Sequence, residues 1–254
     1  MKTPTLIENH NISQSWIEVL KRYGDISGKE LSPLVLTITD FEEDISLREL
    51  LDNHLSIHQK QSIQTVSETI FPLSLSRLFK NNRHELYEEY KSNFKRIKKL
   101  DLNGRNPRNR RGTYFQRLID FPGTNGGINQ LENIIESIQD NKNNRRSRYQ
   151  ASTFDPNSDK LDGPYLGFPC LQHITFYVTE ENGLVLNSFY AVQHLYEKAY
   201  GNWLGLVNLG KFVAEELGIS FERFNCFISI EKLDSLSKTE AKKLYNQAIK
   251  ITKP

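Results

Sequence analysis

The stretch GFPCLQHITFYV, residues 167–178, has the pattern of a buried β-strand with a cysteine set into its first turn, directly after a proline. Glycine and proline interrupt the backbone at its start, and apolar residues then alternate at Ile174, Phe176 and Val178. Cys170 therefore lies at the mouth of the strand. There it is either a small hydrophobic residue that fills a core or a thiol that a substrate can reach.

The segments around this strand predict an α+β fold with a central mixed or antiparallel sheet covered by helices. Strands are expected at 33–41, 170–179, 184–192 and 223–233, with a turn at 181–183. Helices are expected at 11–23, 46–58, 60–80, 84–99, 126–139, 199–217 and 238–251. Pro72 should kink or end the 60–80 helix, Gly218 should stop the 199–217 helix, and Ser237 with Glu240 should cap the last one. Residues 103–117 and 154–166 are expected to be loops.

The composition is that of an ordinary globular protein and excludes several classes. A net charge of +2 over 254 residues is too small to indicate nucleic acid or a membrane surface as partner. Apolar runs stay short of the ~20 residues that cross a bilayer, and the N-terminus lacks the apolar region of a signal peptide. Two cysteines do not make a disulfide framework, so a cytoplasmic location is expected, with Cys226 in the core. No spacing typical of a metal site or a glycine-rich phosphate loop occurs.

Several motifs recur in the order found in one enzyme family. These are INQLENIIESIQDNKNNRR (128–146), Pro169-Cys170, Tyr190 and AYGNWLGLVNLGKFVAEELGI (199–219), with SETIFPL (67–73) and GTYFQR (112–117) upstream. The chain from residue 128 to about 233 resembles the thymidylate synthase and pyrimidine hydroxymethylase family, its archaeal branch more than its bacterial one. The resemblance implies a thymidylate-synthase-like domain over 1–254, with a divergent N-terminal part (1–110) and a catalytic-type half (111–254). It also implies a homodimer formed by sheet-to-sheet packing.

The resemblance implies that the protein transfers a one-carbon unit from 5,10-methylenetetrahydrofolate to C5 of a pyrimidine nucleotide. The C5 carbon is a poor nucleophile until a thiolate adds to C6 and makes the ring enamine-like. A carboxyl group is needed to move protons, and an amide can read the pyrimidine edge by paired hydrogen bonds. By resemblance, the catalytic residues are Cys170 as nucleophile, Glu68 as proton relay, and Tyr114. The substrate-binding residues are Arg145 and Arg146 (across the dimer interface), Asn202, Tyr190, Arg117, His194 and Glu231.

The sequence also departs from the family pattern at substrate-binding positions. The Gln-Arg-Ser triplet that follows the family tyrosine is Ala191-Val192-Gln193 here. The family aspartate that contacts the base is Leu195, which follows His194. The histidine and tyrosine that hold the sugar correspond to Glu231 and Leu233, and Cys170 is followed by leucine rather than histidine. These departures leave open a catalytically inactive or repurposed nucleotide-binding or regulatory homologue. A third reading is a nucleic-acid contact through the 103–117 loop, whose arginines 105, 108, 110 and 111 are otherwise candidate phosphate ligands.

Overall fold

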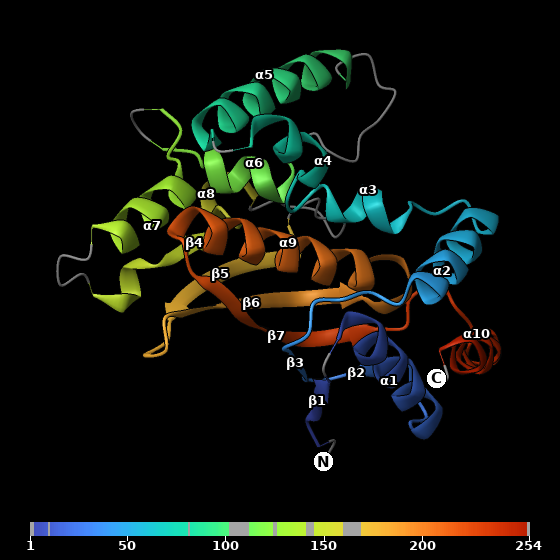
Figure 1. Cartoon of the computed structure of the whole chain (residues 1–254). Coiled ribbons are helices and arrows are strands. Elements are labelled where there is room, and N and C mark those ends of the chain that lie inside the picture. Colours follow the sequence, from blue (N-terminus) through green and yellow to red (C-terminus); the bar gives the residue numbers. More distant parts are fainter. Residues whose placement is uncertain are drawn as a thin grey trace.

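The computed structural model describes residues 3–9, 11–80, 82–101, 112–123, 126–140, 145–159 and 169–252 (Figure 1). The strands are β1 (Thr5–Asn9), β2 (Glu30–Leu31), β3 (Leu34–Ile38), β4 (Gln150–Ser152), β5 (Leu171–Val178), β6 (Gly183–His194) and β7 (Ser220–Lys232). The α-helices are α1 (Ile12–Asp25), α2 (Ile45–Ile57), α3 (Ile63–Ser67), α4 (Leu73–Ser76), α5 (Arg83–Asp101), α6 (Tyr114–Ile119), α7 (Gln130–Gln139), α8 (Pro156–Asp159), α9 (Tyr200–Leu217) and α10 (Lys238–Ile251). Shorter helical turns are η1 (Arg77–Phe79), η3 (Arg146–Arg148) and the π-helical η4 (Leu195–Ala199).

The strands of the described residues form one seven-stranded sheet in the order β1-β3-β7-β6-β5-β4, with β2 paired to β7. β1 with β3 and β6 with β7 run parallel, whereas the other pairs are antiparallel. This confirms the predicted α+β class and the mixed sheet. Strands from the N-terminal part, β1 and β3, join the sheet through β7 from the C-terminal part.

Several local predictions need correction. The expected 154–166 loop contains the short helix α8 (Pro156–Asp159), and residues 160–166 lie outside the described residues. The last residues of the expected 103–117 loop begin helix α6, because the Thr113 side chain caps it by accepting from the Gln116 amide; residues 102–111 lie outside the described residues. The expected 60–80 helix is divided into α3, α4 and η1, and the break at Pro72 agrees with its predicted effect. Strand β1 was not predicted, since five residues at a chain end give little periodic signal and their pairing to β3 is non-local.

Other predicted boundaries are confirmed. Gly218 ends α9 in the left-handed conformation, with φ of 69°, and Ser237 and Glu240 form the capping box of α10. The turn between β5 and β6 places Asn182 at φ of 63°. Cys226 is buried in the core. Among the described helices, none is both long and apolar enough to span a membrane.

One face of the sheet is buried under helices. Helix α9 lies along β6 and β7, with α1 packed beside it and α3 on its first turns (Figure 1). The approach of α3 requires glycine in α9, since a Cβ at Gly201 would lie 2.7 Å from the Val66 Cβ, and one at Gly205 would lie 2.7 Å from the Ser67 carbonyl oxygen. The helix α9 therefore fixes where α3, and the Glu68 that follows it, lies above the sheet.

The other face of the sheet carries aromatic and amide side chains. Phe189 on β6 stacks on Phe227 of β7 with ring centroids 5.7 Å apart, and Phe227 is 41% exposed. Beside this pair, the Asn225 side chain donates to Asn187, which donates to Thr175 on β5. The described helices pack on the opposite face, so they leave this partly apolar surface of the sheet uncovered.

Candidate functional site

Cys170 lies at one end of the sheet, directly before β5. The antiparallel pairing of β5 with β6 places it beside Ala191, whose amide donates to the Cys170 carbonyl at 3.2 Å. The thiol is free and partly buried. Burial raises the pKa of Cys170 above its ordinary value, and the ammonium group of Lys198 acts in the opposite direction. The thiol is therefore placed at the sheet end, and its desolvation is opposed by the charge of Lys198 among the described residues.

Two tyrosines flank this thiol. The Tyr114 hydroxyl is hydrogen-bonded to the backbone of Leu171 and Cys170, and its pKa is raised by burial and by the nearby Cys170. Tyr190 on β6 is directly opposite Leu171 and fully buried, with its hydroxyl unpartnered among the described residues. Burial raises the pKa of Tyr190, with Tyr114 and Cys170 adding to the effect. The structure thus brings together Cys170, Tyr114 and Tyr190, three residues that the sequence analysis named. Their raised pKa values keep all three side chains uncharged at neutral pH.

Glu68 joins this group through α6. The Phe115 amide donates to the Thr69 carbonyl at 3.0 Å, so the segment after α3 is tied to the first turn of α6, where Tyr114 lies. Tyr90 bonds Thr113 at 2.6 Å, and burial raises the pKa of Tyr90 to about 12, with Glu68 contributing in the same direction. The Glu68 carboxylate accepts hydrogen bonds from Ser74, at 3.0 Å from the amide and 2.7 Å from the hydroxyl. Glu68 is therefore held on the α6 side of the cysteine.

Asn202 lies in the first turn of helix α9. It is 5% exposed, and its neighbour Trp203 donates from the indole to the Gln193 side-chain oxygen at 3.0 Å. Gln193 lies in β6, in register with Glu231 on β7. This hydrogen bond fixes the start of α9 over the same end of the sheet that carries Cys170.

Glu231 is the most unusual group in the cluster. Its side chain is fully buried, and neither carboxyl oxygen has a hydrogen-bond partner within the described residues. The Tyr190 hydroxyl and the Gln193 amide nitrogen nearby are likewise unpartnered. Burial raises the pKa of Glu231 well above its ordinary value, because the charged form would lie in a low-dielectric interior. The carboxyl group is therefore neutral in the native state at neutral pH, and its predicted contact with substrate requires the covering groups to move.

This state of Glu231 predicts a pH-dependent stability. In the unfolded chain a glutamate ionises near pH ~4.3, whereas native Glu231 keeps its proton to higher pH. Above the unfolded-state pKa the unfolded chain binds fewer protons, so stability falls by up to about 1.4 kcal/mol per pH unit until pH reaches the native pKa. Glu231→Gln removes this contribution. Urea unfolding at pH 5, 7 and 9 should show the variant gaining stability relative to wild type as pH rises.

The matched control for this prediction is Glu30→Gln. Glu30 lies on the adjacent strand β2, is half exposed, and pairs with Lys232 at 3.2 Å. Its replacement should leave the pH dependence of unfolding nearly unchanged. Parallel pH profiles for wild type and Glu231→Gln would show that Glu231 is ionised in the native protein.

The structure places Arg117 in a buried ion pair. Its guanidinium bonds both Asp159 carboxylate oxygens, at 2.5 and 2.7 Å, and the Thr153 carbonyl at 2.7 Å. Arg117 and Asp159 are 4% and 1% exposed. This bidentate pairing holds α6 to the α8 segment. A role of Arg117 in substrate binding stays a prediction, and any such role would have to be shared with Asp159.

Arg145 and Arg146 lie at the other end of β5. Both are exposed, and the Arg146 guanidinium lies 5.0 Å from the centre of the Tyr177 ring. Tyr177 is seven residues beyond Cys170 along an extended strand, which amounts to roughly 20 Å. Within one chain, these arginines and Cys170 therefore do not share a site.

His194 ends β6 at the same sheet end as Cys170. Its Nδ1 lies 2.9 Å from the Asp234 carboxylate. Burial alone would raise the pKa of Asp234, but His194, Glu197 and Lys60 lower it. Lys60 in turn lies 2.5 Å from Glu197. His194 therefore belongs to a charged network at the edge of the candidate site.

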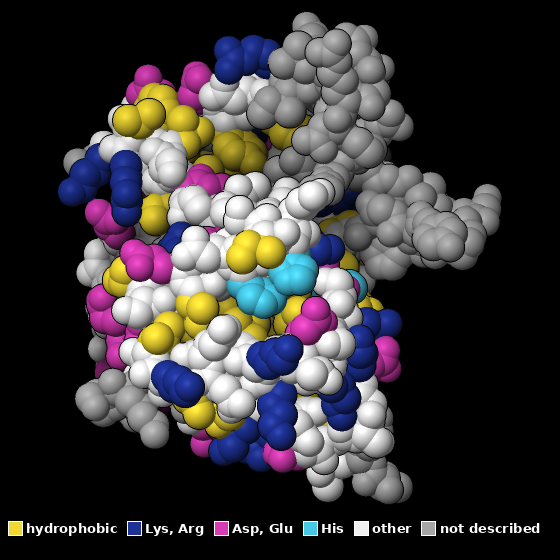
Figure 2. All heavy atoms as spheres, turned by 90° about the vertical axis from the view of Figure 1, so that its right-hand side faces the viewer, with side chains coloured by type: hydrophobic (Ala, Val, Ile, Leu, Met, Phe, Trp, Pro, Cys, Tyr) yellow, Lys and Arg dark blue, Asp and Glu magenta, His cyan; other side chains and the backbone are white. Residues whose placement is uncertain are grey.

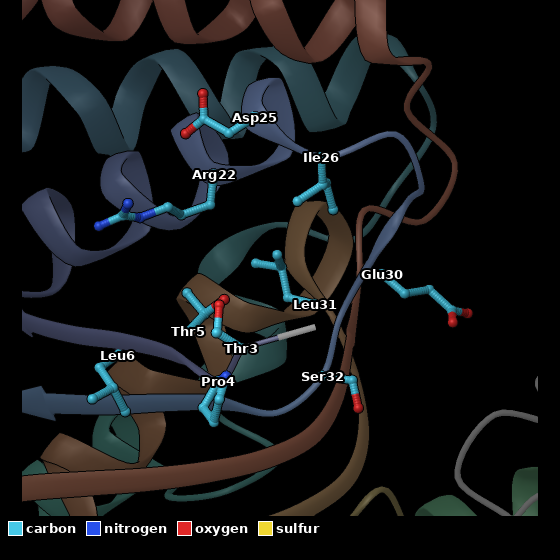
Figure 3. A pocket seen from close by; sticks show the side chains of 10 residues that line it. All are labelled: Thr3, Pro4, Thr5, Leu6, Arg22, Asp25, Ile26, Glu30, Leu31 and Ser32. Carbon is cyan, nitrogen blue, oxygen red and sulfur yellow. The ribbon is translucent and has the colours of Figure 1, made fainter. Parts of the chain in front are cut away.

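Two other features lie outside this sheet end: a pocket near the N-terminus and a surface that carries histidines. Figure 3 shows a pocket of about 540 Å³ between the starts of β1 and β2 and the end of α1, into which Ile26 and Leu31 point. Arg22 and Glu30 extend away from it (Figure 3), so it brings no catalytic pair together. On the face seen in Figure 2, histidines gather among apolar and basic side chains.

Two histidines lie at the end of α2: the ring centroids of His54, in the helix, and His58, its C-cap residue, are 4.8 Å apart. The His54 Nδ1 lies 2.7 Å from the Tyr196 hydroxyl. Burial and His58 lower the pKa of His54, and Glu240 opposes this. The described residues contain no group of three or more histidine, cysteine or acidic side chains arranged to hold a metal. The sheet end around Cys170 is therefore the candidate site.

Lys198, Gln193 and Asp159 were missed from the sequence. Lys198 lies in η4, and Asp159 is 42 residues from the arginine that it binds. No spacing rule connects such residues, because their proximity results from strand pairing and loop path.

The fold and the site define a class of protein: an α+β protein with a partly buried thiol, two tyrosines and a buried glutamate at one end of a mixed sheet. Comparison with known proteins adds a relationship. No family model matches the chain.

Two curated archaeal proteins are similar to this chain, and each is named "Putative thymidylate synthase". The protein of Methanocaldococcus jannaschii is 32% identical over 111 residues, which are 42% of this chain and 48% of the relative. The protein of Methanococcoides burtonii is 26% identical over 220 residues, 85% of this chain and 82% of the relative. The first match thus spans about half the length of the relative. These similarities support a thymidylate-synthase-like relationship without singling out a branch.

Proposed function

We propose that this chain transfers a one-carbon unit from 5,10-methylenetetrahydrofolate to C5 of a pyrimidine nucleotide, through an adduct of the Cys170 thiolate at C6. In this proposal the whole chain is one thymidylate-synthase-like domain. The observation that carries it is the gathering of Cys170, Tyr114 and Tyr190 at one sheet end, from three separate elements. The similar archaeal proteins support the same reaction class.

Each residue has a role in this proposal. Cys170 adds to C6, and the electron density released at C5 attacks the one-carbon unit. Glu68, held by Ser74, relays protons through water. The Asn202 amide reads the pyrimidine edge, and Tyr114, Tyr190 and His194 shape the site around it.

In this proposal, exposed residues that follow Glu68 along the chain contact the one-carbon donor. Leu78 on η1 is 76% exposed, and Arg77 and Lys80 are exposed on either side of it. An apolar side chain between two cations suits a flat ring system that carries carboxylates. When bound, the folate supplies the one-carbon unit.

A homodimer completes this site in the proposal. The uncovered sheet face, with Phe189 and Phe227 at its centre, would pack against the same face of a second copy. Arg145 and Arg146 of that copy would then supply the phosphate contacts that they cannot make to Cys170 within their own chain.

Phe227→Asp tests the dimer. A charge buried at the centre of a self-complementary interface should raise the dissociation constant of the dimer at least about 100-fold. Analytical ultracentrifugation should show a wild-type dimer and a largely monomeric variant. Ile57→Asp, at a 78% exposed position on α2, is the matched control and should stay dimeric. A wild-type monomer at micromolar concentration would contradict the proposal.

A second function has an observation in its favour. Glu231 stands at a position that the resemblance assigns to the substrate sugar, yet it is fully buried and neither carboxyl oxygen is hydrogen-bonded within the described residues, so the sugar contact of the family is not kept there. This favours a nucleotide-binding or regulatory homologue without turnover as the alternative.

One assay separates the two functions. Substitution at C5 releases the hydrogen of that carbon, so purified protein with methylenetetrahydrofolate should release tritium to water from [5-³H]-labelled dUMP, UMP, dCMP or CMP. Release from any one of them supports one-carbon transfer. Binding of a nucleotide by calorimetry with no release from all four would support the regulatory function instead.

A further inference from the structure

Glu68, the proposed proton relay, is held through one of its two carboxyl oxygens. Oε1 accepts three hydrogen bonds, from the Gln64 side-chain amide at 2.6 Å, the Ser74 backbone amide at 3.0 Å and the Ser74 hydroxyl at 2.7 Å. Oε2 accepts none from the described residues, yet it does not belong to their buried unpartnered atoms, so it is open to water. The two oxygens of this carboxyl group are therefore not equivalent.

The orientation of the Gln64 amide is fixed by Arg48. One guanidinium nitrogen of Arg48 donates to the Gln64 side-chain oxygen at 2.8 Å, and another donates to Glu43 at 2.7 Å. A guanidinium can only donate, so the oxygen of Gln64 must face Arg48. The NH2 group of Gln64 then points to Glu68, which lies one helical turn further along α3. Helix α2, which carries Arg48, thereby determines which atom Gln64 presents to Glu68.

This arrangement decides which oxygen of Glu68 carries a proton. An amide N–H cannot accept, so Oε1 must present lone pairs to the side chain of Gln64 and to the backbone of Ser74. A proton taken up from water therefore bonds to a lone pair of Oε2, and it returns to water from the same atom. Anchoring one oxygen keeps the other at a fixed place, which a positioned proton transfer requires.

We propose that Gln64, oriented by Arg48, anchors Glu68 through Oε1 and confines its proton exchange to Oε2. Gln64 is a positioning residue, because it acts through Glu68. The inference rests on the proposed function for the reaction in which Glu68 takes part. The anchoring itself is measured without turnover.

The first experiment replaces the donor of this hydrogen bond by an acceptor of the same shape, in Gln64→Glu. The new carboxylate still accepts from Arg48, but it faces the Glu68 carboxylate at hydrogen-bond distance, so the native pair retains a shared proton. In the unfolded chain both groups ionise near pH ~4.3, so the stability of the variant relative to wild type falls as pH rises above that value. The urea midpoint of Gln64→Glu relative to wild type should be lower at pH 8 than at pH 5 by roughly 0.5 M.

Two further variants control this measurement. Asn53→Asp makes the same amide-to-acid change at an exposed position of α2, and its midpoint relative to wild type should differ by less than about 0.1 M between the two pH values. The double variant Gln64→Glu/Glu68→Gln exchanges donor and acceptor, so it should restore the midpoint at pH 8 to within about 0.2 M of wild type. If Gln64→Glu does not fold, the double variant should still fold, and an unfolded double variant contradicts the inference.

The second experiment measures turnover by tritium release. Gln64→Glu, and Gln64→Met, which removes the donor without adding a charge, should each lower kcat at least about tenfold. The KM for the nucleotide should stay within about threefold of wild type, because Glu68 is not a proposed nucleotide ligand. Asn53→Asp should keep both values within about twofold.

The outcomes separate the anchoring of Glu68 from the reaction. A Gln64→Glu midpoint that differs from wild type equally at both pH values overturns the inference, and so does a kcat of Gln64→Met within about twofold of an active wild type. A pH-dependent difference without tritium release from wild-type protein supports the anchoring and overturns the proposed one-carbon transfer.

Discussion

Cys170→Ala is expected to abolish tritium release from the nucleotide that wild type accepts, by a factor of about 10³ or more. The carbon–hydrogen bond at C5 is not activated until a nucleophile has added to C6, so removing the thiol removes the step on which all later steps depend. Nucleotide binding should persist, because the proposed contacts to base and phosphate come from other residues. The measurement is release rate at saturating nucleotide, with binding followed by calorimetry.

Cys226→Ala is the control for this variant. It removes the other cysteine, which is buried on β7 and whose pKa is raised by burial. It should lower stability through the cavity that it leaves, by roughly 1–2 kcal/mol, but keep release within about tenfold. Release by Cys170→Ala within tenfold of wild type would show that the thiol is not the nucleophile.

Arg117→Met is expected to lower the free energy of unfolding by about 3–5 kcal/mol. The substitution leaves Asp159, 1% exposed, as a buried carboxylate whose bidentate partner is gone. It also leaves the Thr153 carbonyl without the arginine donor that it now has. Urea unfolding followed by fluorescence of Trp16 and Trp203, both fully buried, measures the change.

The double variant Arg117→Met/Asp159→Leu sharpens this test. Removing both charges eliminates the unpaired carboxylate, so the double variant should be more stable than Arg117→Met alone. Arg22→Met is the exposed control, since Arg22 pairs with Glu18 on the surface of α1 at 3.0 Å and should change stability by less than about 1 kcal/mol. A loss below about 1 kcal/mol for Arg117→Met would mean that Arg117 is not structural and is available to a ligand.

The sequence predicted the elements that depend on neighbouring residues. The strand at β5, the break at Pro72, the end of α9 at Gly218 and the capping box at Ser237 all follow from local preferences. Helix α6 was missed because the arginine- and asparagine-rich stretch before it masked a short capped turn. The resemblance to a family also pointed to Cys170, Tyr114 and Tyr190, which lie beside one another in the structure, while their roles stay predictions.

What the sequence by itself determined about this protein is therefore its α+β class, most of its helix boundaries and a set of residues that belong near one thiol. Only the tertiary structure decided the state of those residues: Arg117 is bound to Asp159, and Glu231 is fully buried. The reason is that capping and periodicity act over a few residues along the chain. Burial and charge pairing depend on which distant segments pack together, and they set the ionisation of each group.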